Sequence, residues 1–321
     1  MSYRDRERGP AEPPLPKPYE FVPLAPGRPA GEPPAGHHRY TQGNLSGALS
    51  AQIAARSPVH VASGLLEQKN DRQYPLVKGH FRTKDTPTIP ATSLKVCIRS
   101  IVEAISRSSV QITRARELPR EHQPSRQLDR LDPAQRIFGA LGYQGMVRFA
   151  DAPLAAGGMV TIPSPQLFRP RPESVDTYFD GRQPRGRKFY MHGKLAKGNL
   201  PLEACQVGSR FELRMLFENL TPGELGLVLI ALGLGEPKLW PKLGGGKPAC
   251  LGTIEVIDAR LETLDTRAAY ADFDAAPAPL DARELIDAAR AERLVLEPQL
   301  TRLAEVLRWP REDRECPDRN Y

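Results

Sequence analysis

The chain has few of the features that mark membrane, secreted or metal-clip proteins. It has four cysteines in 321 residues and no Cys-x-x-Cys pair, which argues against a zinc ribbon or a redox motif. The longest apolar run, 225–235, is too short to span a bilayer. The N-terminus lacks the basic and then apolar pattern of a secretion signal. We therefore expect a cytoplasmic protein with reduced cysteines and no membrane contact.

Proline and positive charge, in contrast, are in excess. The 33 prolines are about twice the average share, so long connections between regular elements are expected. The net charge of +7 is concentrated in residues 42–265, which hold 30 basic and 21 acidic side chains. A focused positive field favours a polyanionic partner, with RNA or DNA as the first candidate. A solubilising surface is the alternative.

The composition divides the chain into three parts. Residues 1–41 are rich in Pro, Gly and charge and are predicted to form a disordered or extended arm, because they bury too little apolar surface to offset chain entropy. Residues 42–265 are expected to be the main domain, with a basic insertion around 165–200. Residues 266–321 are predicted to be a linker and an amphipathic helical tail, broken near Glu297 by Pro298.

Hydrophobic periodicity predicts both strands and helices in the main domain. Strands are expected at 45–56, 146–150, 211–217 and 253–259, and helices at about 92–106 and 222–234. Thr92 or Ser93 is expected to cap the first helix, and Thr221 with Glu224 forms a capping box for the second. Residues 64–88 are predicted to be a long loop or a small hairpin insertion.

Two basic clusters stand where they could bind phosphate. Lys95 and Arg99 lie four residues apart at the start of a predicted helix, where the helix dipole disfavours cations. With the free amide groups there they could clamp a phosphate, or they could be two solvated side chains. The glycines Gly244, Gly245 and Gly246 lie between Lys242 and Lys247 and precede a strand, which permits close backbone approach and favours a phosphate guest.

A third basic stretch, residues 165–200, holds eight basic and three acidic side chains with aromatic residues between them. Arg185, Arg187 and Lys188 are followed by Phe189 and Tyr190. Basic groups for the backbone and flat rings for the bases suit single-stranded nucleic acid. A disordered basic loop is the alternative that the residues leave open.

Four segments, taken in order, resemble one known family. They are Ala91-Thr92-Ser93-Leu94-Lys95, Val147-Arg148-Phe149-Ala150-Asp151, Glu218-Asn219-Leu220-Thr221 and Leu243-Gly244-Gly245-Gly246-Lys247. The set, spread over roughly 43–260, resembles the RAMP superfamily, the RRM-like RNA-binding proteins of CRISPR systems. It is most similar to the backbone subunits of type III effector complexes. The resemblance implies an α+β fold with a ferredoxin-like (RRM-like) core and long insertions, to which the hydrophobic periodicity adds a C-terminal helical segment.

The same resemblance implies partners and binding residues. The partners are CRISPR RNA, target RNA and other CRISPR effector subunits. Ser93, Lys95 and Arg99 match the helix that contacts guide-RNA phosphates. The glycine-rich loop of the family is matched by Gly244, Gly245, Gly246, Lys247 and Gly252. The basic stretch 182–197 falls where the family inserts a thumb-like hairpin. The family's usual small-Gly-Ser-Ser-Leu-Lys-Gly reads Ala-Thr-Ser-Leu-Lys-Val at 91–96 here, which indicates a divergent subfamily.

Target RNA cleavage is one activity that the resemblance leaves open. Some backbone subunits use an aspartate between the first strand and the Ser-Leu-Lys helix. This segment offers Asp71 and Asp85, of which Asp71 is preferred because Asp85 lies only five residues before Pro90. Such cleavage would require a divalent metal, Mg²⁺ or Mn²⁺, whereas RNA binding requires no cofactor.

Two other functions remain as alternatives. Some RAMP relatives are metal-independent endonucleases that process the CRISPR precursor with a histidine as general acid or base. His60, His80 and His192 are the candidates, and His192 is favoured because it lies among basic residues. The other alternative is a non-catalytic scaffold whose arm and C-terminal helices dock neighbouring subunits.

Overall fold

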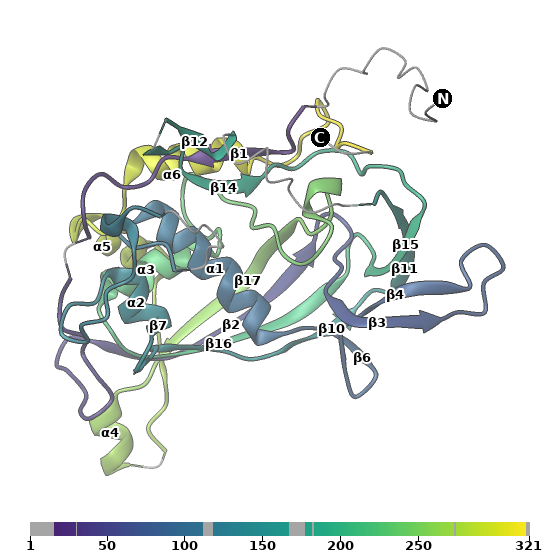
Figure 1. Cartoon of the computed structure of the whole chain (residues 1–321). Coiled ribbons are helices and arrows are strands. Elements are labelled where there is room, and N and C mark those ends of the chain that lie inside the picture. The colour runs from purple at the N-terminus through teal and green to yellow at the C-terminus, as the bar shows by residue number, and fades with distance from the viewer. Residues whose placement is uncertain are drawn as a thin grey trace.

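A central antiparallel sheet organises the molecule, which a computed structural model describes over residues 16–29, 31–111, 118–166, 177–181, 183–272 and 274–318 (Figure 1). The strand order is β18-β17-β2-β16-β10-β6-β5, with β9 also paired to β16. The strands are β2 (Leu45–Ala55), β5 (Arg82–Thr83), β6 (Thr86–Ile89), β9 (Val147–Phe149), β10 (Ala152–Ala156), β16 (Arg210–Leu220), β17 (Ile254–Thr263) and β18 (Ala278–Pro279).

Alternating hydrophobicity explains the central strands. In β16 the side chains of Phe211, Leu213 and Met215 are buried, and the residues between them are exposed. This period of two places every second side chain on the core face. Along β2, Leu49 pairs with Met215 and Ile53 pairs with Phe211, so both strands bury the same face. The four strands predicted from periodicity are confirmed.

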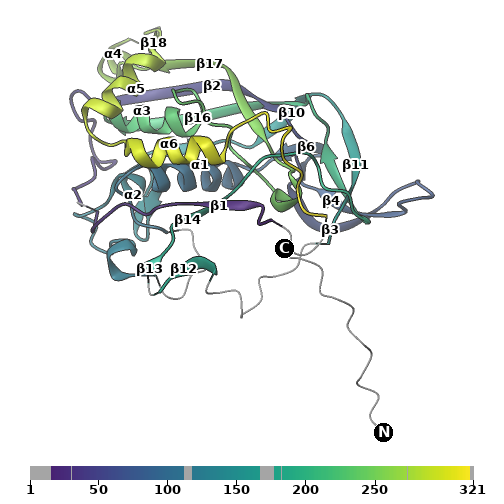
Figure 2. The same cartoon turned by 90° about the horizontal axis from the view of Figure 1, so that it is seen from above.

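Helices cover one face of this sheet (Figures 1 and 2). They are α1 (Ala91–Ile105), α2 (Pro133–Phe138), α3 (Pro222–Ala231), α5 (Ala282–Ala291) and α6 (Glu297–Val306). Helix α1 packs against α2, α3 and α6, and α3 packs against α5. Because α3 has neighbours on nearly every side, it is apolar all round, as a buried helix must be. None of the helices within the described ranges is both long and apolar enough to cross a membrane.

Insertions between the core elements form smaller sheets. The predicted insertion at 64–88 contains the hairpin of β3 (Ala62–Gln68) and β4 (Leu76–His80). This hairpin joins β15 (Leu200–Cys205) and β11 (Met159–Ser164) in a four-stranded sheet. Two short hairpins are formed by β7 (Gly139–Ala140) with β8 (Tyr143–Gln144) and by β12 (Phe179–Asp180) with β13 (Gln183–Pro184). Single 3₁₀ turns are η1 (Arg120–His122) and η3 (Lys247–Ala249).

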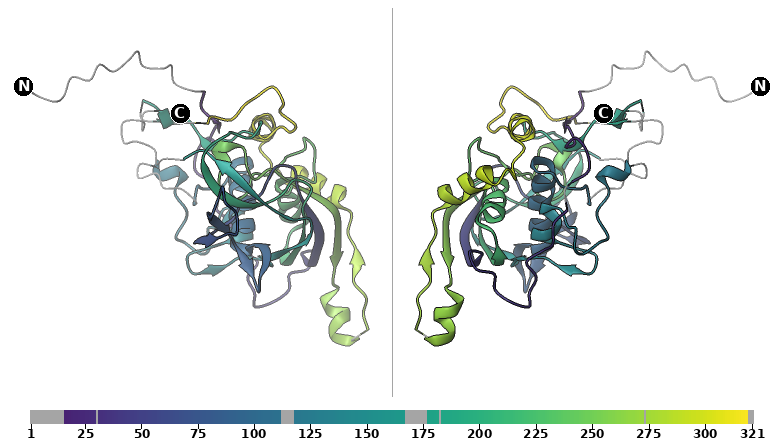
Figure 3. Two further views of the ribbon diagram at one scale, coloured as in Figure 1. Left: turned by 90° about the vertical axis from the view of Figure 1, so that its right-hand side faces the viewer. Right: turned by 90° about the vertical axis from the view of Figure 1, so that its left-hand side faces the viewer.

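The first described strand packs on the core, whereas a helix near the C-terminal part projects from it. The described part of the predicted arm is extended, and its strand β1 (Tyr19–Val22) pairs with β14 (Arg187–Tyr190) alongside α1 and α6 (Figure 2). In the predicted linker, α4 (Thr266–Ala271) lies at the end of a projection beyond the sheet (Figure 3). The predicted break in the helical tail is confirmed, because α5 and α6 are separate and Pro298 lies in the first turn of α6.

The cysteines differ from the expectation of four reduced thiols. Cys250 and Cys316 form a disulfide with a Cα–Cα distance of 5.8 Å, whereas Cys97 and Cys205 are free and buried. The pair is 66 residues apart in sequence, so spacing alone does not reveal it. The disulfide ties the C-terminal segment to the residue that follows η3.

The two predicted helix caps have different outcomes. At α3 the capping box is confirmed, because Thr221 Oγ1 accepts a hydrogen bond from Glu224 N at 3.1 Å. At α1 the prediction is wrong. The N-cap residue is Pro90, whose side chain cannot accept a hydrogen bond. Instead Asp151 Oδ1 accepts from Ala91 N at 2.8 Å, from a loop 60 residues away in sequence.

We expect Thr221→Val to lower the free energy of unfolding by about 1–2 kcal/mol, because the helix loses its cap. Thr92→Val is the matched control. Thr92 is exposed and is not the N-cap residue of α1, so its replacement should change the free energy of unfolding by less than about 0.5 kcal/mol. Urea unfolding of the two variants measures the difference. Equal effects at the two positions would contradict this assignment of caps.

Candidate nucleic-acid interface

The glycine-rich loop, residues 243–252, is fixed by backbone contacts with the segment that follows β2. Gly245 N donates to His60 O at 2.8 Å, and Gly252 N donates to Pro58 O at 2.9 Å. A Cβ on Gly244 would lie 2.2 Å from His60 O, and Gly244 has a φ of +84°. Only glycine combines that conformation with so close an approach. The predicted close backbone approach is therefore present.

The loop keeps backbone donors available at its tip. The N–H groups of Gly244, Gly246 and Lys247 have no hydrogen-bond partner among the residues that the structure describes. Gly246 adopts a left-handed conformation, with a φ of +68°, immediately before η3. Successive N–H groups at such a change of backbone hand form a concavity suited to an anion.

The first turns of α1 lie beside this loop. Cys97 Sγ lies 3.6 Å from Lys242 O, and the charge of Lys247 acts on the Cys97 thiol. Burial raises the pKa of Cys97, and Lys247 offsets part of that rise. Ser93 and Lys95, on the same turns of α1, are half-buried. Sequence segments about 150 residues apart are thus brought together, as the two predicted phosphate clusters require.

Lys95 and Lys247 are the two cations of this surface without a carboxylate partner. Neither makes an ion pair within the described residues. Burial lowers the pKa of Lys95, and the nearby Arg99 guanidinium lowers it further. Because neither lysine is paired with a carboxylate among the described residues, an incoming phosphate could neutralise its positive charge.

Two predicted RNA contacts, Arg99 and Arg187, are instead interior ion-pair partners. Arg99 Nε lies 2.7 Å from Glu103 Oε1, and Arg187 binds the other oxygen of the same carboxylate at 2.5 Å. Arg99 also donates to Gly139 O at 2.9 Å. A shared, fully buried carboxylate joins α1 to β14, so these guanidinium groups hold the fold together rather than face solvent. The spacing of Arg99 and Glu103, four residues on a helix, was the sequence signal for the first pair.

His192 and Lys242 are also interior, contrary to the expectation of surface roles. His192 is fully buried, with Nδ1 2.8 Å from Thr253 Oγ1 and Nε2 2.9 Å from Trp240 O. Burial, with the charge of Lys242, lowers the pKa of His192 to about 3. Lys242 is 6% exposed, and its Nζ donates to Met191 O at 2.7 Å. A histidine enclosed in this way cannot exchange protons with an RNA 2′-hydroxyl.

The basic insertion is packed against the N-terminal arm where it is described. The Lys188 ammonium lies 4.7–5.1 Å from the ring centres of Tyr19, Tyr178 and Tyr190, a cation–π arrangement of three rings. Burial raises the pKa of Tyr19 to about 12, and Tyr178 adds to the rise. Arg185 is exposed and donates to Phe179 O at 3.1 Å. Residues 167–176 and 182 of the predicted insertion lie outside the described residues.

Sequence reasoning missed a buried polar cluster at the base of the β3–β4 hairpin. Glu203 binds Lys69 at 2.6 Å and Arg82 at 2.7 Å. Burial alone would raise the pKa of Glu203, but Arg82 and Lys69 lower it to about 2. His80 lies beside them, and burial, with the His60 ring, lowers the pKa of His80 to about 4. These neutral histidines and the paired carboxylate anchor the hairpin.

Asp71 stands at the tip of that hairpin. Its Oδ1 accepts hydrogen bonds from Gln73 N at 2.8 Å and Tyr74 N at 3.2 Å, so the carboxylate closes the turn. The described part of the chain holds no group of three or more His, Cys, Asp or Glu that could bind a metal ion. Asp71 is therefore an exposed carboxylate with one oxygen used in the turn.

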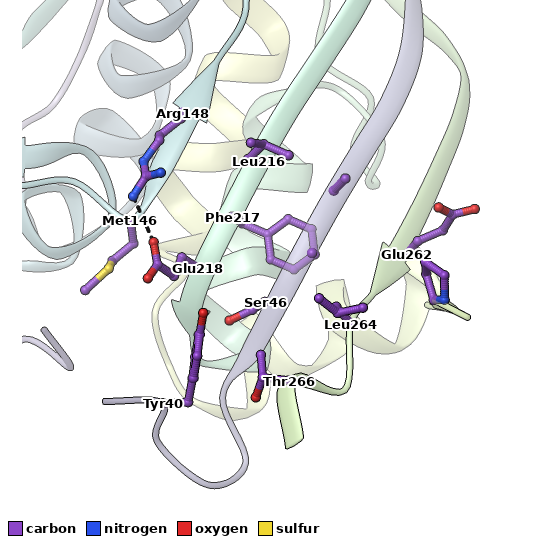
Figure 4. A pocket seen from close by; sticks show the side chains of 13 residues that line it. Tyr40, Ser46, Met146, Arg148, Leu216, Phe217, Glu218, Glu262, Leu264 and Thr266 are labelled. Carbon is purple, nitrogen blue, oxygen red and sulfur yellow. Dashed lines mark hydrogen bonds and ion pairs between the residues drawn. The ribbon is translucent and has the colours of Figure 1, made fainter. Parts of the chain in front are cut away.

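The face of the sheet opposite the helices carries an apolar hollow of about 350 Å³ (Figure 4). Tyr40, Leu216 and Leu264 line it and are exposed. At its edge Arg148 and Glu218 form an ion pair at 2.9 Å. Glu262 is a further acidic residue of the lining.

The fold is α+β, and its glycine-rich loop, which carries Lys247, lies beside the first turns of α1, which carry Lys95. The model of the RAMP superfamily matches residues 52–255, a range that includes both features. The chain belongs to the RAMP superfamily. A search of curated proteins finds no match to it. Membership of this superfamily indicates an RNA-binding protein associated with CRISPR systems.

Gly244→Ala should destabilise the protein by roughly 3 kcal/mol or more, for two reasons. The new Cβ would force the loop away from His60 O, and alanine is strained in the left-handed conformation. Gly64→Ala is the matched control. Gly64 has a φ of +85°, and a Cβ there would meet nothing within 4 Å, so about 1 kcal/mol is expected. Chemical unfolding of both variants compares them. Equal losses would show that backbone strain alone, not the approach to His60, requires the loop glycine.

Proposed function

We propose that the chain is a backbone subunit of a type III-like CRISPR effector complex and binds CRISPR RNA along its phosphates. The observation that carries this proposal is the juxtaposition of the α1 start with the glycine-rich loop, each with a cation that has no carboxylate partner in the part of the chain that the structure describes. Lys95 and Lys247 supply charge, and the N–H groups of the loop supply neutral donors. Ser93 adds a hydroxyl on the first turn of α1.

The strand order supports a ferredoxin-like (RRM-like) core. In chain order the core elements are β2, α1, β9 with β10, β16, α3 and β17, a β-α-β-β-α-β series. Across the sheet they follow β17-β2-β16-β10, so each helix connects two strands that have another strand between them. In this core the proposed RNA surface is formed by residues that follow β2 and precede β17.

Binding here would depend on charge more than on base identity. Loop amides, a serine and two lysines recognise phosphate and carry no sequence information of their own. The open sheet face presents Arg210, Glu212, Arg214 and Leu216 on β16, none of which is an aromatic base platform. Sequence selection would therefore come from base pairing by the bound RNA, with the protein as the support.

The alternative functions are supported less well. Processing of the precursor needs an accessible acid–base histidine, and the favoured candidate, His192, is enclosed in the core. A scaffold without RNA contacts leaves the unpaired cations of the loop and α1 without a role. The hollow around Leu216 and the projection of α4 remain available for neighbouring subunits under either proposal (Figure 3).

Lys247→Gln and Lys95→Gln should each weaken binding of labelled single-stranded RNA severalfold. Each should also reduce the slope of log affinity against log salt by about 0.7, the value for one phosphate contact. Arg267→Gln on α4 is the charge-matched control at an exposed site far from the loop, and it should leave the slope unchanged. Identical slopes for all four proteins would contradict a phosphate-binding role for these lysines.

Target RNA cleavage is a separate hypothesis, which substitution of Asp71 tests. Asp71→Ala removes an exposed carboxylate and should leave RNA affinity unchanged. If the chain cuts target RNA in the presence of Mg²⁺ or Mn²⁺, this variant should lose cleavage and the Asp85→Ala control should retain it. Cleavage by Asp71→Ala at the wild-type rate would exclude Asp71 from the reaction.

A further inference from the structure

The C-terminal segment, residues 307–318, returns from α6 to the glycine-rich loop. Lys194 N donates to Arg314 O at 2.8 Å, and Cys316 N donates to Lys194 O at 3.2 Å. The disulfide between Cys316 and Cys250 then fixes the segment to the residue after η3. This segment, although it belongs to a part of the chain with more acidic than basic residues, therefore lies beside the glycine-rich loop.

Two arginines of this segment join a cluster of cations. Arg311 NH1 lies 3.5 Å from Met191 Sδ, and Arg314 NH1 donates to the carbonyl of the next residue, His192, at 3.1 Å. Lys242 Nζ binds the Met191 carbonyl from the loop side. The side chains of Arg311, Arg314 and Lys242 therefore meet at the consecutive residues Met191 and His192, although they come from distant parts of the chain.

The charge of this cluster is poorly neutralised. Burial lowers the pKa of Lys242 strongly, and Arg314 and Lys247 lower it further. Burial and then Arg311 lower the pKa of Arg314, and the smaller opposing effects of Asp313 and Glu20 do not cancel this. The carboxylate in contact is Asp313, 3.5 Å from Arg311, but it is 58% exposed and is shared with Arg308. Repulsion of this kind is relieved when an anion binds.

Arg311 also lacks a partner at one atom. Its Nε is buried and has no hydrogen-bond partner among the described residues, and the whole side chain is only 18% exposed. A guanidinium Nε–H is a strong donor, and leaving it unmatched costs free energy unless a ligand supplies an acceptor. Because Nε itself is buried, a phosphate would meet the exposed part of this guanidinium, and a small turn of the side chain would then bring Nε–H to a phosphate oxygen, since guanidinium groups bind phosphate through paired N–H donors.

We propose that Arg311 and Arg314 extend the RNA-binding surface and bind backbone phosphates next to those held by Lys247. This inference rests on the proposed function, since the ligand is the same RNA strand. The C-terminal segment thereby acts as a second wall of the phosphate path, and the loop is the first. The disulfide and the Lys194 contacts hold the two walls together.

The test compares Arg311→Gln, Arg311→Lys and Arg308→Gln in the full chain, with labelled single-stranded RNA at about 50 and 200 mM salt. Arg311→Gln should weaken binding roughly fivefold and reduce the salt slope by about 0.7. Arg311→Lys keeps the charge and should keep the slope. Arg308 is 59% exposed and pairs only with Asp313 Oδ2 at 3.6 Å among the described residues, away from Met191 and His192, so its variant should match the wild type.

The outcomes separate this inference from the function on which it rests. Wild-type protein that binds RNA, with Arg311→Gln indistinguishable from Arg308→Gln, would overturn the inference and leave the proposed function intact. Wild-type protein that binds no RNA would overturn both.

A measurement on the unaltered protein covers the case in which a variant fails to fold. RNA should protect Arg311 and Arg314, but not Arg308, from an arginine-specific dicarbonyl reagent detected by mass spectrometry. Equal modification of the three arginines with and without RNA would contradict the proposal.

Discussion

The hydrogen bonds that Gly245 and Gly252 donate to the carbonyls of His60 and Pro58 are the contacts on which the surface depends. They fix the loop to the end of β2, the central strand of the core. Close backbone approach requires glycine at Gly244, so the sequence of the loop follows from the packing. With its base tied down, the loop can leave the donors at its tip without protein partners, beside the start of α1.

Basic residues fall into two groups around this constraint. Arg99 and Arg187 share the buried carboxylate of Glu103 and join α1 to the strand pair β1–β14. Lys95 on α1 and Lys247 on the glycine-rich loop have no such partner among the described residues and are partly exposed. A buried pair is hard to break because the remaining charge would be stranded, so the first group is structural. The second group carries the proposed affinity for RNA.

Much of the core could be predicted because its signals are local. Alternation in 211–217 identified β16, and Thr221 with Glu224 identified the start of α3. The cap of α1 could not be predicted, because Asp151 reaches it from a loop distant in sequence. The contacts of Arg311 and Arg314 with Met191 and His192 also join segments distant in sequence, so no local pattern indicates them.

The candidate site was predictable in part for the same reason. The glycine run and Lys95 carry local signals, and folding brings them together. Whether a basic residue faces solvent is decided by partners from other elements, such as Glu103 for Arg187 and Met191 for Lys242. Those partners are visible only in three dimensions. The family match over 52–255 covers the core and leaves the C-terminal wall outside.

The most direct test of the account is to purify the tagged protein from its native host and sequence the RNA that accompanies it. The account predicts RNAs of uniform length that share a repeat-derived end, because a CRISPR guide would occupy the loop and α1 surface. Recovery of no RNA, or of fragments with random ends, would contradict guide binding and leave the cations of the surface without their proposed ligand.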